Sequence, residues 1–171
     1  MSGPPKNLRI ARCACGSVEF EAVGAPILCA ACYCDDCQEG ARRIEALPGA
    51  SPVQGPDGGT EFVLYRKDRA RCTKGSQLLK RHKLREKSAT NRVVATCCNA
   101  AMVLDFDDSK HWVSMYRARF QGDAPPLEVR VCTKFKPESS VLPDDVPSHS
   151  MYPFKFVTKL IAARIAMLFQ R

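Results

Sequence analysis

The stretch from Cys29 to Cys37, which reads C-A-A-C-Y-C-D-D-C, constrains this chain more than any other part of its sequence. Four of the ten cysteines lie within it. Cys32, Cys34 and Cys37 follow a C-x-C-x-x-C spacing, which lets one tight turn direct several sulfurs to a single point. A bound metal ion is the simplest reason for such an arrangement.

The composition indicates where these cysteines act. A chain of 171 residues fits one domain, and its apolar fraction of 45% and charged fraction of 26% are those of an ordinary globular protein. Residues Met1 to Arg12 contain no apolar run typical of a secretory signal. We therefore expect the reducing cytoplasm, where cysteines serve as metal ligands or reactive thiols rather than as a disulfide framework.

The charge balance gives only a weak indication of partners. Lysine and arginine outnumber aspartate and glutamate by 26 to 18, for a formal charge of +8, but thiolates bound to two zinc ions would lower it to about +5. The basic run from Lys80 to Lys87 contains no aromatic residues that could stack on bases. We therefore interpret it as a solvated face and expect no nucleic-acid partner.

Two further cysteine clusters flank predicted strands. Cys13 and Cys15 form a C-x-C-G turn before an alternating strand that ends at Val23, and two buried structural thiols are the alternative interpretation. Cys97 and Cys98 lie at the tip of a predicted hairpin. Neighbouring strand residues point to opposite faces, so both can bind one metal only if the backbone leaves strand geometry there. Otherwise one binds, and Cys98, closer to the turn, is favoured.

The remaining segments define the expected organisation. We predict a zinc-binding β domain over residues 1–136, which includes a short helix or irregular turn over Gln38–Leu47, and a proline-rich linker or surface wrap over residues 137–153. Cys72 and Cys132 are isolated in the sequence and are interpreted as ordinary buried thiols.

Residues 154–171 are predicted to form an amphipathic helix. Its apolar positions recur at helical spacing, and they are Val157, Leu160, Ile161, Ile165 and Leu168. Packing on its own domain or in a homodimer is favoured over contact with a membrane surface. The segment is too short and too charged to span a bilayer.

Taken together, the Cys13-x-Cys15-Gly turn, the Cys32-x-Cys34-x-x-Cys37 turn and the later cysteine pair resemble the glutathione-dependent formaldehyde-activating enzyme family, which includes centromere protein V. The resemblance implies a mostly β fold, a zinc-containing β-tent of folded antiparallel sheets, here with a C-terminal amphipathic helix. It also implies two zinc ions. Carried over by position, Cys13 and Cys15 would hold a structural Zn²⁺ with sulfur from Cys97 and Cys98, while Cys32, Cys34 and Cys37 would hold a second Zn²⁺ that keeps an open position.

The activity implied by the resemblance is that of a carbon-sulfur lyase that forms or cleaves S-hydroxymethylglutathione. Asp35 and Asp36 lie inside the second cysteine turn and would repel an anionic substrate such as glutathione, unless they bind its ammonium group or a basic partner. They therefore favour a divergent member whose substrate differs from glutathione. Cys29 would close the second site if it were a fourth ligand, and we favour a non-ligand role. A non-enzymatic zinc-binding interaction module with a basic surface is the alternative function.

Overall fold

The computed structural model describes residues 7–122 and 124–169, and most of its regular structure is β-strand. The strands are β1 (Leu8–Arg12), β2 (Glu19–Val23), β3 (Leu28–Cys32), β4 (Thr60–Arg66), β5 (Ala70–Lys74), β6 (Leu79–His82), β7 (Thr90–Ala95), β8 (Ala100–Phe106), β9 (Trp112–Tyr116) and β10 (Val129–Val131). The helices are α1 (Asp35–Glu45), α2 (Phe154–Phe169) and the short 3-10 helices η1 (Lys67–Arg69), η2 (Ser76–Leu78), η3 (Arg117–Phe120) and η4 (Thr133–Phe135).

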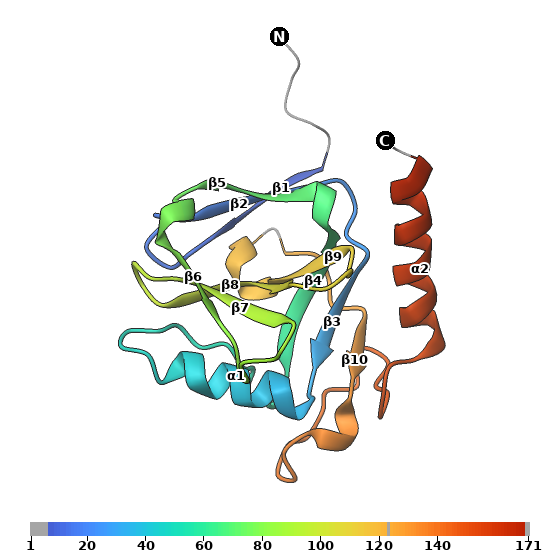
Figure 1. Ribbon diagram of the computed structural model, residues 1–171. Helices are drawn as coiled ribbons and strands as arrows, with labels where there is room; N and C mark the ends of the chain where they lie inside the picture. Colours follow the sequence, from blue (N-terminus) through green and yellow to red (C-terminus); the bar gives the residue numbers. More distant parts are fainter. Residues whose placement is uncertain (1–6, 123, 170–171) are drawn as a thin grey trace.

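The strands form a small sheet and a large one. The small sheet has the order β1-β2-β5, and the large sheet has the order β10-β3-β4-β9-β8-β7-β6. Adjacent strands are antiparallel except for β10 and β3, which run parallel. Figure 1 shows the small sheet above the large one, α1 below it, and α2 standing along one side. The predicted mostly β fold of antiparallel sheets with a C-terminal helix is confirmed.

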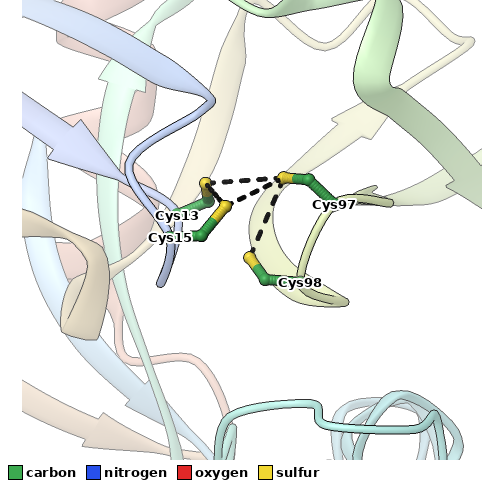
Figure 2. A group of neighbouring side chains, drawn as sticks. All are labelled: Cys13, Cys15, Cys97 and Cys98. Atoms are coloured by element: carbon green, nitrogen blue, oxygen red, sulfur yellow. Dashed lines mark hydrogen bonds between the residues drawn. The ribbon is translucent and has the colours of Figure 1, made fainter.

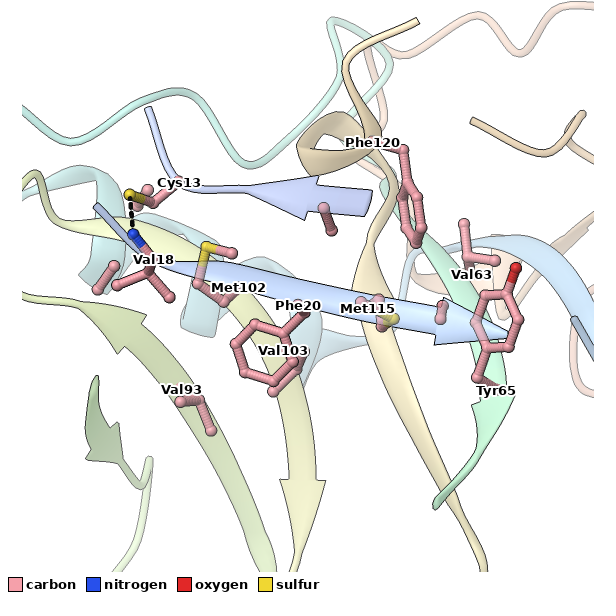
Figure 3. Packing of buried hydrophobic residues seen from close by; sticks show 14 of the residues in the cluster. Cys13, Val18, Phe20, Val63, Tyr65, Val93, Met102, Val103, Met115 and Phe120 are labelled. Carbon is pink, nitrogen blue, oxygen red and sulfur yellow. Dashed lines mark hydrogen bonds between the residues drawn. The ribbon is translucent and has the colours of Figure 1, made fainter. Parts of the chain in front are cut away.

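Both faces of the large sheet are buried, and β4 shows how. Successive strand residues point to opposite faces, so Val63 and Tyr65 enter the core shared with the small sheet, whereas Phe62 and Leu64 enter the core on the opposite face. Figure 3 shows the first of these cores around Phe20. The second core receives side chains from α1 and α2. Cys32 lies in this core, and Cys34 and Cys37 pack against it.

Helix α2 confirms the predicted C-terminal helix but divides its predicted apolar stripe. Phe156 and Leu160 pack against the second core, while Ile161 and Ile165 are 54% and 50% exposed. The Leu160 carbonyl is 2.8 Å from His111 Nε2, and Lys159 pairs with Glu128, so the helix is held against the sheet. No helix in residues 7–122 or 124–169 has the length and apolar character needed to cross a membrane.

The proline-rich segment over residues 137–153 follows the surface without a strand or helix of its own. It is attached to β10 by the bridge between Arg130 and Ser148 and by an ion pair of 2.5 Å between Arg130 and Asp145. These contacts fix the direction from which the chain enters α2.

Candidate metal centres and the adjoining pocket

The first thiol group consists of Cys13, Cys15, Cys97 and Cys98, whose sulfurs all lie within 4.8 Å of one another. Cys97 Sγ is 3.8 Å from Cys13 Sγ, 3.3 Å from Cys15 Sγ and 3.9 Å from Cys98 Sγ (Figure 2). Four sulfurs bound tetrahedrally to zinc are separated by about 3.8 Å, given a Zn–S bond of about 2.3 Å. The donor set therefore fits a closed structural zinc site.

Two turns bring these sulfurs together. The turn between β1 and β2 places Gly16 at a φ of 74°, and the Val18 N–H donates a hydrogen bond of 3.2 Å to Cys13 Sγ. The turn between β7 and β8 places Asn99 at a φ of 51°. Because the backbone leaves strand geometry in this turn, Cys97 joins Cys98 in the group. Zinc binding by these residues stays a prediction.

The second thiol group consists of Cys32, Cys34 and Cys37, whose sulfurs also lie within 4.8 Å of one another. Cys32 ends β3 and Cys34 is the N-cap of α1. The sequence predicted a short helix or an irregular turn over Gln38–Leu47, and the structure has a helix that begins earlier, at Asp35, so Cys37 lies in its first turn.

The start of α1 favours a thiolate at this group. Hydrogen bonds from the Cys32 and Cys37 thiols, together with the backbone N–H groups of Cys37 and Asp36, lower the pKa of Cys34 to about 3. The positive end of the helix dipole acts in the same direction. Three sulfurs, one of them readily ionised, form a donor set that fits a zinc site with one position left open.

Cys29 does not join this group. It lies on β3 with its side chain in the first core, whereas Cys32 lies in the second core on the other face of the same strand. Burial raises the pKa of the Cys29 thiol to about 12, so it stays protonated. Its position agrees with the non-ligand role favoured from the sequence.

Cys132 lies next to the second group, whereas its isolated position in the sequence predicted only an ordinary buried thiol. The parallel pairing of β10 with β3 sets Val131 opposite Cys32, and Cys132 follows at a φ of 59°. Burial raises the pKa of the Cys132 thiol, and the neighbouring Tyr152 hydroxyl and Cys32 thiol act to lower it. Only this pairing between distant segments places a fourth cysteine beside the three, so no local spacing could have predicted it.

A pocket of about 460 Å³ opens beside the second thiol group. All three cysteines of the group line it, and the large sheet and α2 form its walls. Phe62, Leu104 and Trp112 come from the sheet, and Phe156 and Leu160 come from α2. Sequence reasoning had assigned none of these five side chains to a site, because they reach it only after the sheet is assembled.

The carboxylate of Asp36 at the pocket is already paired. Arg85 Nη2 lies 2.7 Å from Asp36 Oδ1, so the repulsion that the sequence predicted for an anionic thiol is partly offset by this arginine. Arg92, only 4% exposed, donates a hydrogen bond to the Asp36 carbonyl and lies against Gly40 of α1. These contacts attach the first turn of α1 to β7.

The contact between Gly40 and Arg92 makes a substitution test possible. A Cβ at Gly40 would lie 1.8 Å from Arg92 Nε, so the buried guanidinium would have to move. Gly40→Ala is therefore expected to lower the free energy of unfolding by about 1–3 kcal/mol, although alanine is the better helix former by about 1 kcal/mol. Urea denaturation measures this difference, and an unchanged or raised midpoint would contradict the packing described.

Fold and site define a class of mostly β proteins that carry a four-thiol group between two sheets and a three-thiol group beside a pocket. Residues 8–48 match the model of the family described as glutathione-dependent formaldehyde-activating enzyme. This segment holds five of the seven cysteines in the two groups, so the chain is similar to that family over the part that carries most of the clustered thiols.

Comparisons with solved structures and with curated proteins show less similarity than the family model does. A crystal structure of a Rhodobacter sphaeroides protein, a structural-genomics target, is similar with 16% identity and a TM-score of 0.48. The match covers 82% of this chain and 99% of that one. The search of curated proteins found no match.

Proposed function

We propose that this protein is a zinc-dependent carbon-sulfur lyase that acts on the adduct of formaldehyde with a thiol, the reaction class to which cleavage of S-hydroxymethylglutathione belongs, with a substrate that has diverged from glutathione. The observation that carries the proposal is the three-thiol group with a pocket directly beside it. A site with three protein ligands keeps a position for substrate, whereas a structural site is closed by four. The family match over residues 8–48 supports the same reaction class.

The reaction is an addition that involves no net oxidation. The thiol sulfur bonds to the carbonyl carbon, the π electron pair of the carbonyl moves to oxygen, and the thiol proton is transferred to that oxygen. A bound zinc ion supplies Lewis acidity toward oxygen. Cys32, Cys34 and Cys37 would hold the ion as thiolates, and the apolar pocket walls exclude water that competes with the thiol.

Exchange spectroscopy by NMR tests the proposal. The zinc-loaded protein is expected to accelerate exchange between formaldehyde hydrate and its thiol adduct well above the spontaneous rate, and a metal-free sample should lose the acceleration. The panel of thiols must include glutathione and uncharged alkyl thiols. If no thiol in the panel exchanges faster with protein present, the lyase proposal is wrong.

A second candidate function is a non-enzymatic zinc module that binds a partner through its surface. The observation in its favour is the outer face of α2, where Phe154, Ile161 and Leu168 are 84%, 54% and 60% exposed. Two closed metal sites and no response to any thiol would favour this function over the enzyme. Contact of α2 with a membrane surface and a homodimer both stay predictions.

A further inference from the structure

We propose that the pocket selects a thiol adduct with an uncharged, apolar body, an alkyl or aryl thiol rather than a carboxylate-bearing one such as glutathione. This inference rests on the proposed function and names the substrate class of the same site. It follows from three properties of the pocket, namely its lining, the pairing of its charged residues and the origin of its outer wall.

The lining beyond the three cysteines is mainly aromatic and aliphatic. Phe62, Leu104 and Trp112 line the side formed by the sheet, and Phe156 and Leu160 line the side formed by α2. Apolar surface that a ligand covers is removed from water, so affinity for this lining grows with the apolar area of the ligand. A thiol with a hydrocarbon body gains from every one of these contacts.

Each charged residue that lines the pocket already has a partner within the protein. Asp36 pairs with Arg85, and the Arg92 guanidinium donates to the Asp36 carbonyl. Lys110 pairs with Asp108, and its Nζ also lies 5.0 Å from the centre of the Phe106 ring.

Glutathione carries two carboxylates and an ammonium group, which need such partners when they leave water. In the described part of the chain, the pocket lining offers these charges no cation or anion without an existing contact. To bind there, glutathione would have to compete with the Asp36–Arg85 or Lys110–Asp108 ion pair, or draw the buried Arg92 away from the Asp36 carbonyl, and each of these changes lowers affinity.

The outer wall of the pocket comes from α2, which lies outside the segment that matches the family. The Leu160 carbonyl oxygen lies 2.8 Å from His111 Nε2, and Lys159 pairs with Glu128, so α2 is held in place as the wall of the pocket. The next residue, Ile161, is 54% exposed and is not part of the lining. The same helix therefore provides both a pocket residue and a matched control of similar size.

The experiment uses the zinc-loaded full chain and the fluorescence of Trp112, the single tryptophan, which lines the pocket. Hexanethiol and 6-mercaptohexanoate have the same chain length and differ by a terminal carboxylate. Hexanethiol is expected to bind at least about tenfold more tightly, because the carboxylate would lose hydration without gaining a partner. From propanethiol to hexanethiol, affinity should rise about fourfold per methylene.

Variants of α2 test whether the preference for hexanethiol arises from the pocket wall. Leu160→Gln is expected to weaken hexanethiol binding about tenfold, since it places an amide against the ligand, whereas Ile161→Gln should leave binding unchanged. Circular dichroism checks that both variants fold, and Leu160→Ala serves as the second variant if the first does not. Its smaller side chain should also weaken hexanethiol, by a few fold.

The outcomes separate this inference from the proposed function. Equal or tighter binding of 6-mercaptohexanoate or glutathione, or equal effects of the two glutamine variants, would overturn the apolar substrate class. If glutathione adducts are also turned over, the lyase proposal stands without this inference. Apolar selectivity in binding without turnover of any adduct would support this ligand class and overturn the lyase.

Discussion

Cys34→Ala is expected to lower the bound zinc from two ions per chain to one and to abolish adduct exchange. Cys34 is the thiol whose pKa is lowered most by its neighbours, and its sulfur lies within 4.8 Å of both Cys32 and Cys37. Removal leaves two sulfurs, too few to hold zinc against water and competing thiols. The four-thiol group does not contain Cys34 and should keep its ion. Elemental analysis of protein equilibrated with excess zinc and then desalted measures the change.

Cys72→Ala provides the matched control for this experiment. Cys72 lies on β5, belongs to neither thiol group and donates to the Lys74 carbonyl at 3.3 Å. It should keep both zinc ions and full exchange activity. A Cys34→Ala protein that retains two ions would show that the three-thiol ligand set is wrong, and wild-type protein with less than one ion would remove both metal sites.

Cys97→Ser is expected to lower the unfolding temperature by about 10 °C, corresponding to a loss of about 3 kcal/mol or more. Cys97 is exposed, so by packing alone its substitution should change stability by no more than about 0.5 kcal/mol. A metal that binds only the folded chain stabilises it by mass action. Here it would join the β1–β2 turn to the β7–β8 turn, since Cys13 and Cys97 are 84 residues apart.

A chelator separates metal loss from other causes. Chelation should lower the unfolding temperature of the wild type toward that of Cys97→Ser and should change the variant much less. Cys72→Ser is the control and should respond to chelation as the wild type does. Identical unfolding of wild type and Cys97→Ser, each with and without chelator, would contradict a structural metal at this group.

The sequence predicted which cysteines lie together within each turn because their spacing is local, whereas only the family resemblance implied that the turn of Cys13 and Cys15 joins the hairpin of Cys97 and Cys98. The spacing of Cys32, Cys34 and Cys37 fixes how far apart their sulfurs can lie, whatever the rest of the chain does. The hairpin that carries Cys97 and Cys98 was likewise evident from two β-rich segments around a turn. Helix α2 was predicted from its apolar spacing, but spacing could not tell which apolar side chains face the sheet.

What the sequence determined by itself is therefore the set of seven clustered cysteines, the mostly β class and the terminal helix. The sequence favoured a non-ligand role for Cys29, but only the tertiary structure places its side chain in the opposite core from Cys32, because the core that each face of β3 enters depends on how both sheets pack. Only the parallel pairing of β10 with β3 placed Cys132 beside Cys32. The pocket likewise forms only in the tertiary structure, because Leu160 of α2 and residues of the large sheet line it together. Contacts between distant segments depend on strand register and packing, which local spacing does not encode.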